Sequence, residues 1–343
     1  MNEILVDVIV PVYNVEPYLD EFFTSLKKQT NQSFRIIVVY DESQDNSLEI
    51  IEKYKSFFKN RLIIIVNQTR SGLAHARNVA LDSQYIKSKY FSFLDPDDTI
   101  ENTFFEKLIN SIESNDSDIV VCGFNRCNIS TNTIVSIDMV NNPTYILNPS
   151  FYSKSIFFNI AVWNKLYRTE KFSKFRFDEI KRCEDLTYFL KVFSRASKIS
   201  FINEPLYHYA IREGSLIQTF DVEHLSSVLS AVKSFSDTES LKDNYDFVCG
   251  VLFIRLCLGV GLRIYSYNKT QYKESRNISL KFLNKYFPNW NKTKYLSFRT
   301  CVKNGKKAFL IHIYKFLFRM GLSKNAISFY LNRCKKKNKE IHW

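Results

Sequence analysis

Four short apolar runs, separated by stretches with helical spacing, occupy the first hundred residues and restrict the fold more than any other feature. The runs lie at residues 4–10, 34–40, 62–66 and 90–94, and the first is rich in β-branched residues. Helical spacing separates them at residues 18–29, 47–58 and 74–83. Because parallel strands need crossover helices between them, this order predicts an α/β fold with a doubly wound, mostly parallel central sheet. Ligands of such sheets bind beyond the carboxyl ends of the strands.

The strand signals continue to about residue 220 and then stop. Another strand is expected at 119–124 and a hairpin-like excursion at 134–146, with helices from about residue 100 and over 185–195. The segment 161–167 and an apolar segment around 199–209 complete this part of the chain. Beyond residue 220, helical spacing covers 225–235, 245–265, 272–286 and 303–334. We therefore expect an α/β domain over residues 1–219 and a helical region over residues 220–343.

Positive charge is concentrated near residue 343. The chain has 48 Lys and Arg against 35 Asp and Glu, and residues 292–343 hold 14 of the basic side chains but one acid, Glu340. The rest of the chain is neutral overall. Lysines and arginines in this basic tail alternate with apolar anchors on one side of the predicted helix, namely Phe309, Leu310, Ile313, Phe316, Leu317 and Met320. This pattern fits either a helix packed on the domain or one lying in an anionic membrane interface.

The compartment is predicted from the cysteines and the apolar runs. Seven cysteines lack the paired spacing of zinc sites, which favours free thiols in a reducing compartment. Asp7 interrupts the first apolar run, so it is expected to be a strand and not a signal peptide. The apolar stretch 247–264 contains Arg255 and Arg263, so no membrane span is expected. We expect a cytoplasmic protein, held peripherally at the inner face of the membrane if the basic tail binds lipid.

Acidic side chains follow the fourth predicted strand. Asp95 and Asp97 are two positions apart, so in an extended backbone both carboxylates face the same side and suit Mg²⁺ or Mn²⁺. The alternative is a turn in which Asp98 or Thr99 caps a helix from about Ile100.

Three further motifs offer groups for binding and catalysis. After the second strand, Asp41 can accept a hydrogen bond from the ring N–H of a uracil, and Tyr13 offers a ring face on which the base can stack. The alternative is that this loop only caps the following helix through Asp45 or Ser47. Arg77, in a segment that opens a helix, suits a diphosphate or a structural ion pair. Glu184 and Asp185 precede an apolar helix. One of these acids can act as a general base in catalysis, or it can be the N-cap of the helix.

The order of these motifs resembles a family 2 glycosyltransferase. The likeness covers roughly residues 4–215 and rests on VIVPVYN at 8–14, DESQDNS at 41–47, GLAHARN at 72–78, LDPDD at 94–98, AVWNKLY at 161–167 and ED at 184–185. The resemblance implies a GT-A fold and transfer of a sugar, with inversion, from a nucleotide-sugar donor. The acceptor would be a glycan or a lipid-linked oligosaccharide in the synthesis of cell-surface polysaccharide.

The resemblance also implies roles for single residues. Pro11, Tyr13, Asp41, Arg77 and Asp95 would bind the donor, and Asp97 would hold Mn²⁺ or Mg²⁺ together with His208. Asp185 would be the base that deprotonates the acceptor hydroxyl, with Glu184 as its neighbour, and Trp163 and Lys165 would shape the acceptor side.

Two positions depart from the family pattern. Tyr40, Asp41 and Glu42 stand where Asp-Asp-Gly is usual, which weakens the preference for uridine, and Arg70 with Ser71 replaces Asn-x before Gly72.

Two other functions are compatible with this sequence: that of a basic nucleic-acid-binding protein, or that of a GT-A protein that binds the donor without catalysis. The neutral body and the acids at the strand ends argue against the first, so no nucleic acid partner is expected.

Overall fold

A computed structural model describes residues 3–67, 72–131, 133–139, 146–147, 156–180, 183–211, 221–236 and 239–336. The chain forms two compact units that interleave along the sequence. The first unit comprises residues 1–149, 159–179 and 196–213, and the second comprises 150–158, 180–195 and 214–343. This division differs from the single boundary expected after residue 219, because the segment 180–195 belongs with the helices of the second unit.

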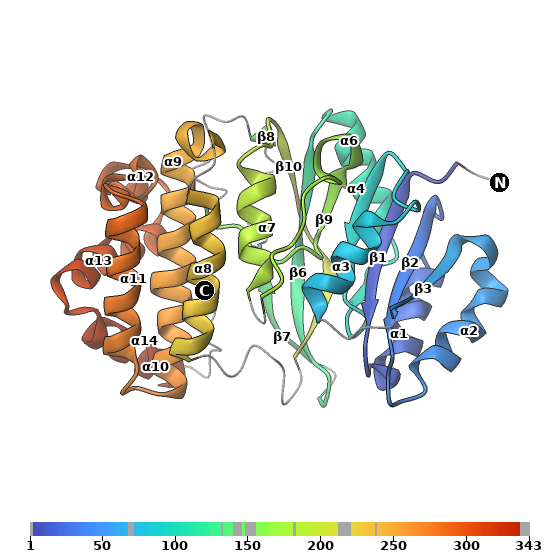
Figure 1. The fold of residues 1–343 in the computed structure, drawn as a ribbon, viewed down its shortest axis with the longest axis horizontal. Helices are drawn as coiled ribbons and strands as arrows, with labels where there is room; N and C mark the ends of the chain where they lie inside the picture. Colours follow the sequence, from blue (N-terminus) through green and yellow to red (C-terminus); the bar gives the residue numbers. More distant parts are fainter. Residues whose placement is uncertain are drawn as a thin grey trace. The chain divides into compact units, whose positions relative to one another are not determined.

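Ten strands in the described part of the chain form one sheet, which is the centre of the first unit (Figure 1). The order along the sheet is β3-β2-β1-β4-β9-β6-β10-β5, with β7 paired to β6 and β8 paired to β10. The strands are β1 (Val6–Val12), β2 (Phe34–Asp41), β3 (Leu62–Asn67), β4 (Tyr90–Phe93), β5 (Thr99–Ile100), β6 (Ile119–Asn128), β7 (Thr133–Asp138), β8 (Ile146–Leu147), β9 (Lys165–Arg168) and β10 (Ile199–Ile211).

The sheet is mixed but largely parallel, which confirms the predicted fold class. Strands β1, β2, β3 and β4 are parallel, as are β6 and β10, while β9 runs antiparallel to both β4 and β6. The carboxyl ends of β1, β2, β3, β4, β6 and β10 therefore meet at one edge. All seven residues of β1 are buried, as expected for a central strand covered on both faces.

Helices cover both faces of this sheet. Helices α1 (Glu16–Lys27), α2 (Ser47–Phe58) and α4 (Phe104–Ser114) contribute to one core cluster with Val8 and Val10 of β1. Helix α3 (Leu73–Asp82) packs against β1 and β2, on the face to which Ile9 points. The short elements η1 (Lys59–Arg61) and α6 (Thr169–Phe172) complete the unit.

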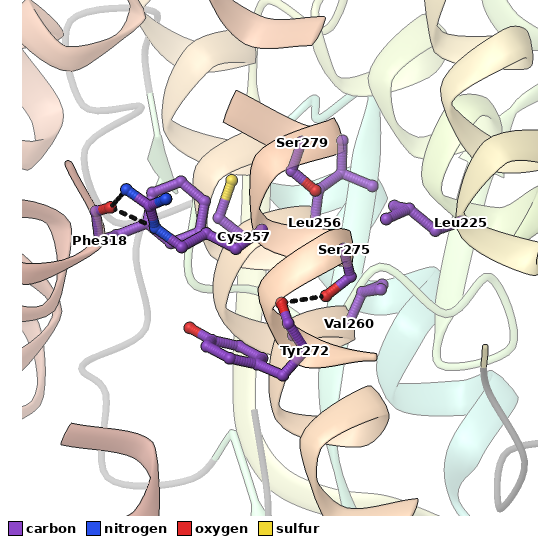
Figure 2. A pocket seen from close by; sticks show the side chains of 10 residues that line it. Leu225, Leu256, Cys257, Val260, Tyr272, Ser275, Ser279 and Phe318 are labelled. Carbon is purple, nitrogen blue, oxygen red and sulfur yellow. Dashed lines mark hydrogen bonds between the residues drawn. The ribbon is translucent and has the colours of Figure 1, made fainter. Parts of the chain in front are cut away.

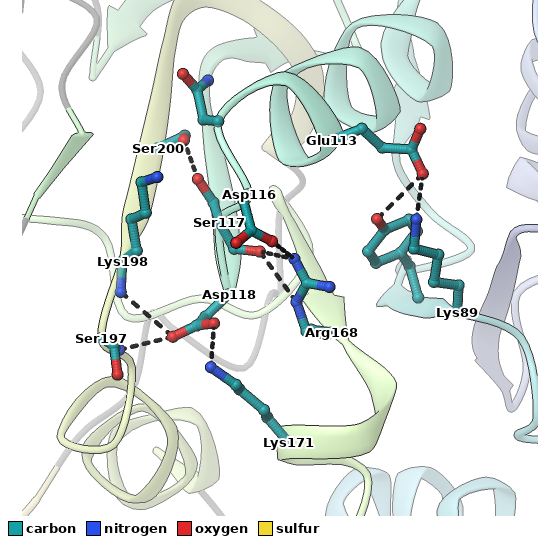
Figure 3. Close-up of polar contacts among 12 residues, drawn as sticks. Lys89, Glu113, Asp116, Ser117, Asp118, Arg168, Lys171, Ser197, Lys198 and Ser200 are labelled. Carbon is teal, nitrogen blue, oxygen red and sulfur yellow. Dashed lines mark hydrogen bonds and ion pairs between the residues drawn. The ribbon is translucent and has the colours of Figure 1, made fainter.

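Ion pairs and hydrogen bonds tie the strands together at the amino edge, opposite the carboxyl ends (Figure 3). Asp118, which is buried just before β6, accepts hydrogen bonds from the Ser197 N–H at 2.7 Å and from Lys171 Nζ at 2.6 Å. Arg168 Nη2 donates to Asp116 Oδ1 at 2.8 Å. These contacts hold the starts of β6 and β10 and the end of β9 in register.

The second unit is helical in its described part. Its elements are α7 (Glu184–Phe193), α8 (Val222–Ser236), α9 (Glu239–Leu252), the π-helical η3 (Phe253–Val260), α10 (Gly261–Tyr267), α11 (Tyr272–Tyr286), η4 (Trp290–Lys292), η5 (Lys294–Leu296), α12 (Phe298–Lys303), α13 (Lys306–Met320) and α14 (Ser323–Lys336). The Phe253 ring lies in its core, with ring centroids 5.4 Å from Trp290 and 5.8 Å from Phe318. The helical C-terminal region predicted from the sequence is confirmed.

One helical stretch, Asn244–Tyr267, is long and apolar enough to cross a membrane by length and composition. Of its most apolar window, 83% is buried within the structure. A buried core helix has the same composition, so the stretch is weak evidence for a membrane span.

Candidate functional site

Side chains from three neighbouring strands meet at the carboxyl edge of the sheet. Tyr13 follows β1, Asp41 ends β2 and Asn67 ends β3. Asp41 is 4% exposed, and its Oδ1 atom accepts a hydrogen bond from Asn67 Nδ2 at 2.8 Å. Asn67 was not singled out from the sequence, although its place at the end of a third parallel strand was the available signal. The contact fixes a carboxylate at the position where such sheets bind ligands.

Pro11 lies within β1 and shows why this strand tolerates a proline. The Ile9 carbonyl accepts a hydrogen bond from the Leu94 N–H, so by alternation the Pro11 nitrogen also faces the β4 side. The pairing of β1 with β4 ends at Ile9 and Phe93, so a donor at Pro11 would have no partner strand. Pro11 therefore ends the pairing and opens the edge of the sheet beside Tyr13.

The loops after β1 and β2 are interlocked. Asp45 Oδ2 accepts from the Glu16 N–H at 2.9 Å, and Ser47 Oγ accepts from the Val15 N–H at 3.2 Å. Partial burial would raise the pKa of Asp45, but hydrogen bonds from Ser47 and Glu16 outweigh it and lower that pKa. The N-cap of α2 is Asn46, without a side-chain capping bond. Asp45 and Ser47 thus hold the Tyr13 loop against the Asp41 loop, a role that goes beyond capping.

The acids after β4 lie on a turn and not on an extended segment. The Asp98 N–H donates to the Asp95 carbonyl at 3.1 Å, which places Pro96 and Asp97 at the two central positions. The extended geometry expected for Asp95 and Asp97 is therefore wrong. A helix from Ile100 is wrong too, because Thr99 and Ile100 form β5 and α4 begins at Phe104.

Arg77 and Asp95, both predicted to bind the donor, are brought together. Arg77 Nη2 lies 2.9 Å from Asp95 Oδ1, and the Arg77 side chain is 1% exposed against 21% for Asp95. The guanidinium group also lies over the rings of Phe93 and Phe177, at 5.9 and 5.2 Å from their centroids. A buried cation therefore orients Asp95 at the carboxyl edge of the sheet. Arg70 and Ser71, where the sequence departs from the family pattern, lie outside the described residues.

Asp98 is a buried acid beneath this turn. Its carboxyl oxygens accept from Tyr207 Oη at 2.5 Å and from the Ala210 N–H at 2.7 Å. Burial, with the nearby charges of Asp97 and Asp95, raises the pKa of Asp98 well above its usual range. Asp98 therefore anchors the turn to β10 and does not cap a helix.

The donor set of the turn fits a hard divalent cation. Besides burial, the charges of Asp97 and Asp95 lie close enough to Asp98 to raise its pKa. A cation bound there would relieve the repulsion among these three acids. In the described part of the chain, no three His, Cys, Asp or Glu side chains gather as a complete ligand set. A cation at Asp97 would thus need oxygen ligands from bound molecules and water, as Mg²⁺ commonly has.

His208, the second predicted metal ligand, lies in β10 with protein partners at both ring nitrogens. Nε2 is 2.9 Å from Glu101 Oε1, and Nδ1 is 3.1 Å from Asn125 Nδ2. Its neighbour Tyr207 points to the opposite face of the strand, toward Asp98. A role for His208 in binding metal stays a prediction, and it would require the contact with Glu101 to open.

Trp163 and Lys165, predicted at the acceptor side, are both buried. The Trp163 ring stacks on Tyr207 at 4.2 Å between centroids. Lys165 is fully buried, and its Nζ donates to Asn164 Oδ1 at 2.7 Å and to the carbonyls of Asn159 and Ala161. Neither side chain is exposed here, and their role at the acceptor side stays a prediction. Any influence on the acceptor side would act through the segment 159–164 that they hold.

Glu184 and Asp185 belong to the second unit, in the first turn of α7. Neither acid is the N-cap: that position is Cys183, whose φ of 61° is left-handed. Both residues are half-buried and lie at the positive end of the helix dipole. Arg182 lies outside the described residues, and the assignment of Asp185 as a base stays a prediction.

A hollow in the second unit is core packing and not a ligand site. Figure 2 shows side chains from α8, η3 and α11 around it, among them Leu225, Cys257 and Tyr272. Arg276 also lines it and donates from Nε to the Phe318 carbonyl at 2.8 Å. The space between the side chains does not admit a water molecule.

Comparison with known proteins gives the same family throughout. The family model described as "Glycosyl transferase family 2" matches residues 7–176. The chain is 34% identical over 224 residues to "Uncharacterized glycosyltransferase EpsJ" of Bacillus subtilis, a match covering 62% of this chain and 63% of that protein. It is 33% identical over 244 residues to "Glycosyltransferase GlyA" of Streptococcus pneumoniae, covering 66% of this chain and 33% of that protein. The matches thus span a third to somewhat under two thirds of these relatives.

Solved structures share the fold. The structure of S. aureus TarS 1-349 in complex with UDP-GlcNAc has a TM-score of 0.67 at 21% identity, covering 98% of this chain and 93% of that chain. The mannosyltransferase PcManGT from Pyrobaculum calidifontis, in complex with GDP-Man and Mn²⁺, has a TM-score of 0.55 at 12% identity, covering 94% of this chain and 87% of that chain. The fold is therefore of the GT-A type predicted from the sequence.

Proposed function

The chain belongs to glycosyl transferase family 2, and from this membership we propose that it transfers a sugar from a nucleotide-sugar donor to a hydroxyl group of a glycan or lipid-linked oligosaccharide. The reaction would invert the anomeric carbon and serve the synthesis of cell-surface polysaccharide. The observation that carries the proposal is the carboxyl edge of the sheet, where a fixed Asp41 ends β2 and the Arg77–Asp95 pair lies beyond β4, on the other side of β1.

The nucleotide would bind between the loops after β1 and β2. Tyr13 is half-exposed and offers a ring face for stacking, while Asp41 supplies a carboxylate that can accept a base N–H. We propose a uridine nucleotide because a uracil ring N–H matches that acceptor. The structural neighbour TarS, crystallised with UDP-GlcNAc, supports the same choice.

The diphosphate would lie over the Asp95–Asp98 turn. Asp97 would hold Mn²⁺ or Mg²⁺, since Asp95 is already oriented by Arg77 and Asp98 is buried. A divalent cation bound there would neutralise charge on the leaving diphosphate. The structure of PcManGT, the second structural neighbour, is a complex with GDP-Man and Mn²⁺, which supports this assignment.

The acceptor hydroxyl would lose its proton to Asp185, with Glu184 beside it. An inverting transfer is a single displacement, so it needs a base on the side opposite the leaving group. Asp185→Asn keeps the size of the side chain but cannot take up a proton. We expect transfer to fall roughly 100-fold or more, while the affinity for the nucleotide, measured by calorimetry, stays near that of the wild type. Loss of nucleotide binding would contradict the role as base.

Slow hydrolysis of a panel of nucleotide sugars with and without Mn²⁺ tests the donor class without requiring the acceptor. We expect hydrolysis of a uridine diphosphate sugar that depends on the cation, and its loss in Asp97→Asn. Asp116→Asn is the matched control, because Asp116 has an 88% exposed side chain at the opposite edge of the sheet. Equal hydrolysis by Asp97→Asn and the control would overturn the metal assignment, and no hydrolysis or nucleotide binding by the wild type would overturn the function.

A further inference from the structure

Helix α13 packs into the second unit with side chains other than the six apolar anchors named from the sequence. Ala308, Ile311, Tyr314 and Phe318 are buried. Tyr314 Oη donates to the Cys257 carbonyl at 3.0 Å, and the Phe318 ring packs on Phe253. These side chains recur every three or four residues, so they form the stripe that joins the helix to its unit.

The opposite side of α13 is also apolar, but it is exposed. Leu310 is 55% exposed, Ile313 39%, Phe316 58% and Met320 61%. At about 100° per residue these four side chains centre roughly half a turn from the buried stripe. Packing of the helix on its own unit therefore does not account for them. The other two of the six expected anchors, Phe309 and Leu317, lie on the same side of the helix and are half-buried.

Helix α12 extends this exposed surface. Phe298 is 61% exposed and Val302 52%, and they lie one turn apart on α12. The Phe298 ring approaches the Phe309 ring of α13 to 6.0 Å between centroids, which joins the two helices at the surface. We call this surface the α12–α13 face, made of Phe298, Val302, Leu310, Ile313, Phe316 and Met320.

Helices α12 and α13, which form the α12–α13 face, carry basic side chains, and acidic side chains are absent from this part of the sequence. No Asp or Glu occurs between residues 298 and 339. Exposed basic residues on the same two helices and their connection are Arg299, Lys303, Lys306, Lys307 and Arg319. One lysine of the predicted basic tail, Lys315, does not lie at the surface. It is buried, and its Nζ donates to the carbonyls of Asn291 and Leu296 at 2.9 and 2.8 Å.

We propose that the α12–α13 face binds the surface of an anionic lipid bilayer. The exposed aromatic and aliphatic side chains would enter the boundary between headgroups and acyl chains, and the lysines and arginines would contact lipid phosphates. Charge selects this occupant over a second copy of the chain, because two such faces packed together would bring basic side chains of both copies near one another, and α12 and α13 carry no Asp or Glu. The proposal does not rest on the proposed catalytic function.

Flotation of the full chain with lipid vesicles tests the proposal and needs no donor turnover. At low ionic strength we expect the protein to float with vesicles made of equal parts phosphatidylcholine and phosphatidylglycerol. It should stay at the bottom of the gradient with phosphatidylcholine alone. High salt should weaken the binding, since exposed charges are screened.

Two sets of variants separate apolar insertion from charge. Leu310→Ser with Phe316→Ser removes exposed apolar side chains and keeps every charge, so we expect vesicle affinity to fall roughly 10-fold or more. Lys303→Gln with Lys306→Gln and Lys307→Gln should remove the preference for anionic vesicles. Tyr267→Ser is the matched control, since Tyr267 is 65% exposed on α10, outside the face. Thermal unfolding identical to wild type would show that each variant is folded.

Three results would overturn the proposal. The first is wild-type protein that fails to float with anionic vesicles at low salt. The second is unchanged flotation of the Leu310→Ser, Phe316→Ser variant, which would mean that the face does not insert. The third is a wild-type dimer in sedimentation without lipid that the same variant converts to a monomer, which would assign the face to a second copy.

Discussion

At the scale of single residues, Asp98 shows how a site can depend on an acid that does not itself line the surface. Its two carboxyl oxygens accept from Tyr207 Oη and from the Ala210 N–H, and both partners lie more than a hundred residues further along the chain. The same residue donates its N–H to the Asp95 carbonyl. Asp98 thus connects the turn that carries Asp97 to the middle of the sheet.

Replacement of Asp98 tests its role as the anchor of the turn. Asp98→Ala leaves a buried hydroxyl and a buried N–H without an acceptor, so we expect the free energy of unfolding to fall by about 2 to 5 kcal/mol. Tyr207→Phe removes only the hydroxyl and should cost about 1 kcal/mol. Urea denaturation of both variants gives the two values. Equal losses in the two variants would mean that the Ala210 contact contributes nothing.

At the scale of elements, the loops after β1 and β2 form a single unit of structure. Asp45 accepts from Glu16 in the first loop and Ser47 accepts from Val15, while Glu16 in turn accepts from the Asn46 N–H at 2.9 Å. Contacts in both directions fix the distance between the Tyr13 loop and the Asp41 loop. The spacing available to a nucleotide base is set by these contacts and not by the strands alone.

Asp45→Ala should therefore affect ligand binding more than stability. We expect a loss of about 1 kcal/mol in the free energy of unfolding and a drop of roughly 5-fold or more in affinity for UDP, measured by calorimetry. Asp118→Ala is the converse control, because its contacts lie at the amino edge of the sheet (Figure 3). It should lose about 2 to 3 kcal/mol of stability and keep its UDP affinity. If both variants lose affinity equally, the effect belongs to the fold and not to the loops.

At the scale of the whole molecule, the helical unit has its own aromatic core. Phe318 of α13 packs on Phe253, and Tyr314 bonds to the backbone of η3, so the basic C-terminal helices are part of that core as well as of the surface. Removal of α13 would expose Phe253 and Trp290. The apolar surface of α12 and α13 is therefore best altered by substitution in the full chain.

Phe318→Ala tests whether α13 is part of the core of the second unit. Phe318 is 1% exposed, and loss of its ring would leave a cavity, so we expect the free energy of unfolding to fall by about 3 to 5 kcal/mol. Phe316→Ala, two residues away on the exposed side, should change it by less than about 0.5 kcal/mol. Chemical denaturation of the two variants measures this contrast, and similar losses would mean that both sides of the helix are packed.

The sequence by itself determined the local elements and the order in which they occur. Helix α2 spans the residues that the spacing predicts, 47–58, and α11 does the same at 272–286, because apolar periodicity is a property of neighbouring residues. The parallel sheet followed from the alternation of strand and helix. The positions of Asp41 at the end of its strand and of Asp95 just after its strand followed from the rule that parallel strands end at one edge.

Only the tertiary structure decided how these elements use their side chains. Asp98 is drawn to Tyr207, Thr99 and Ile100 join β10 as a strand instead of starting a helix, and Lys165 is buried among carbonyl groups. In α13 four of the six predicted apolar anchors are exposed, and a different stripe of the helix is buried against its own unit. Each outcome depends on partners distant in the sequence, and local spacing carries no information about which partner a side chain will meet once the chain has folded.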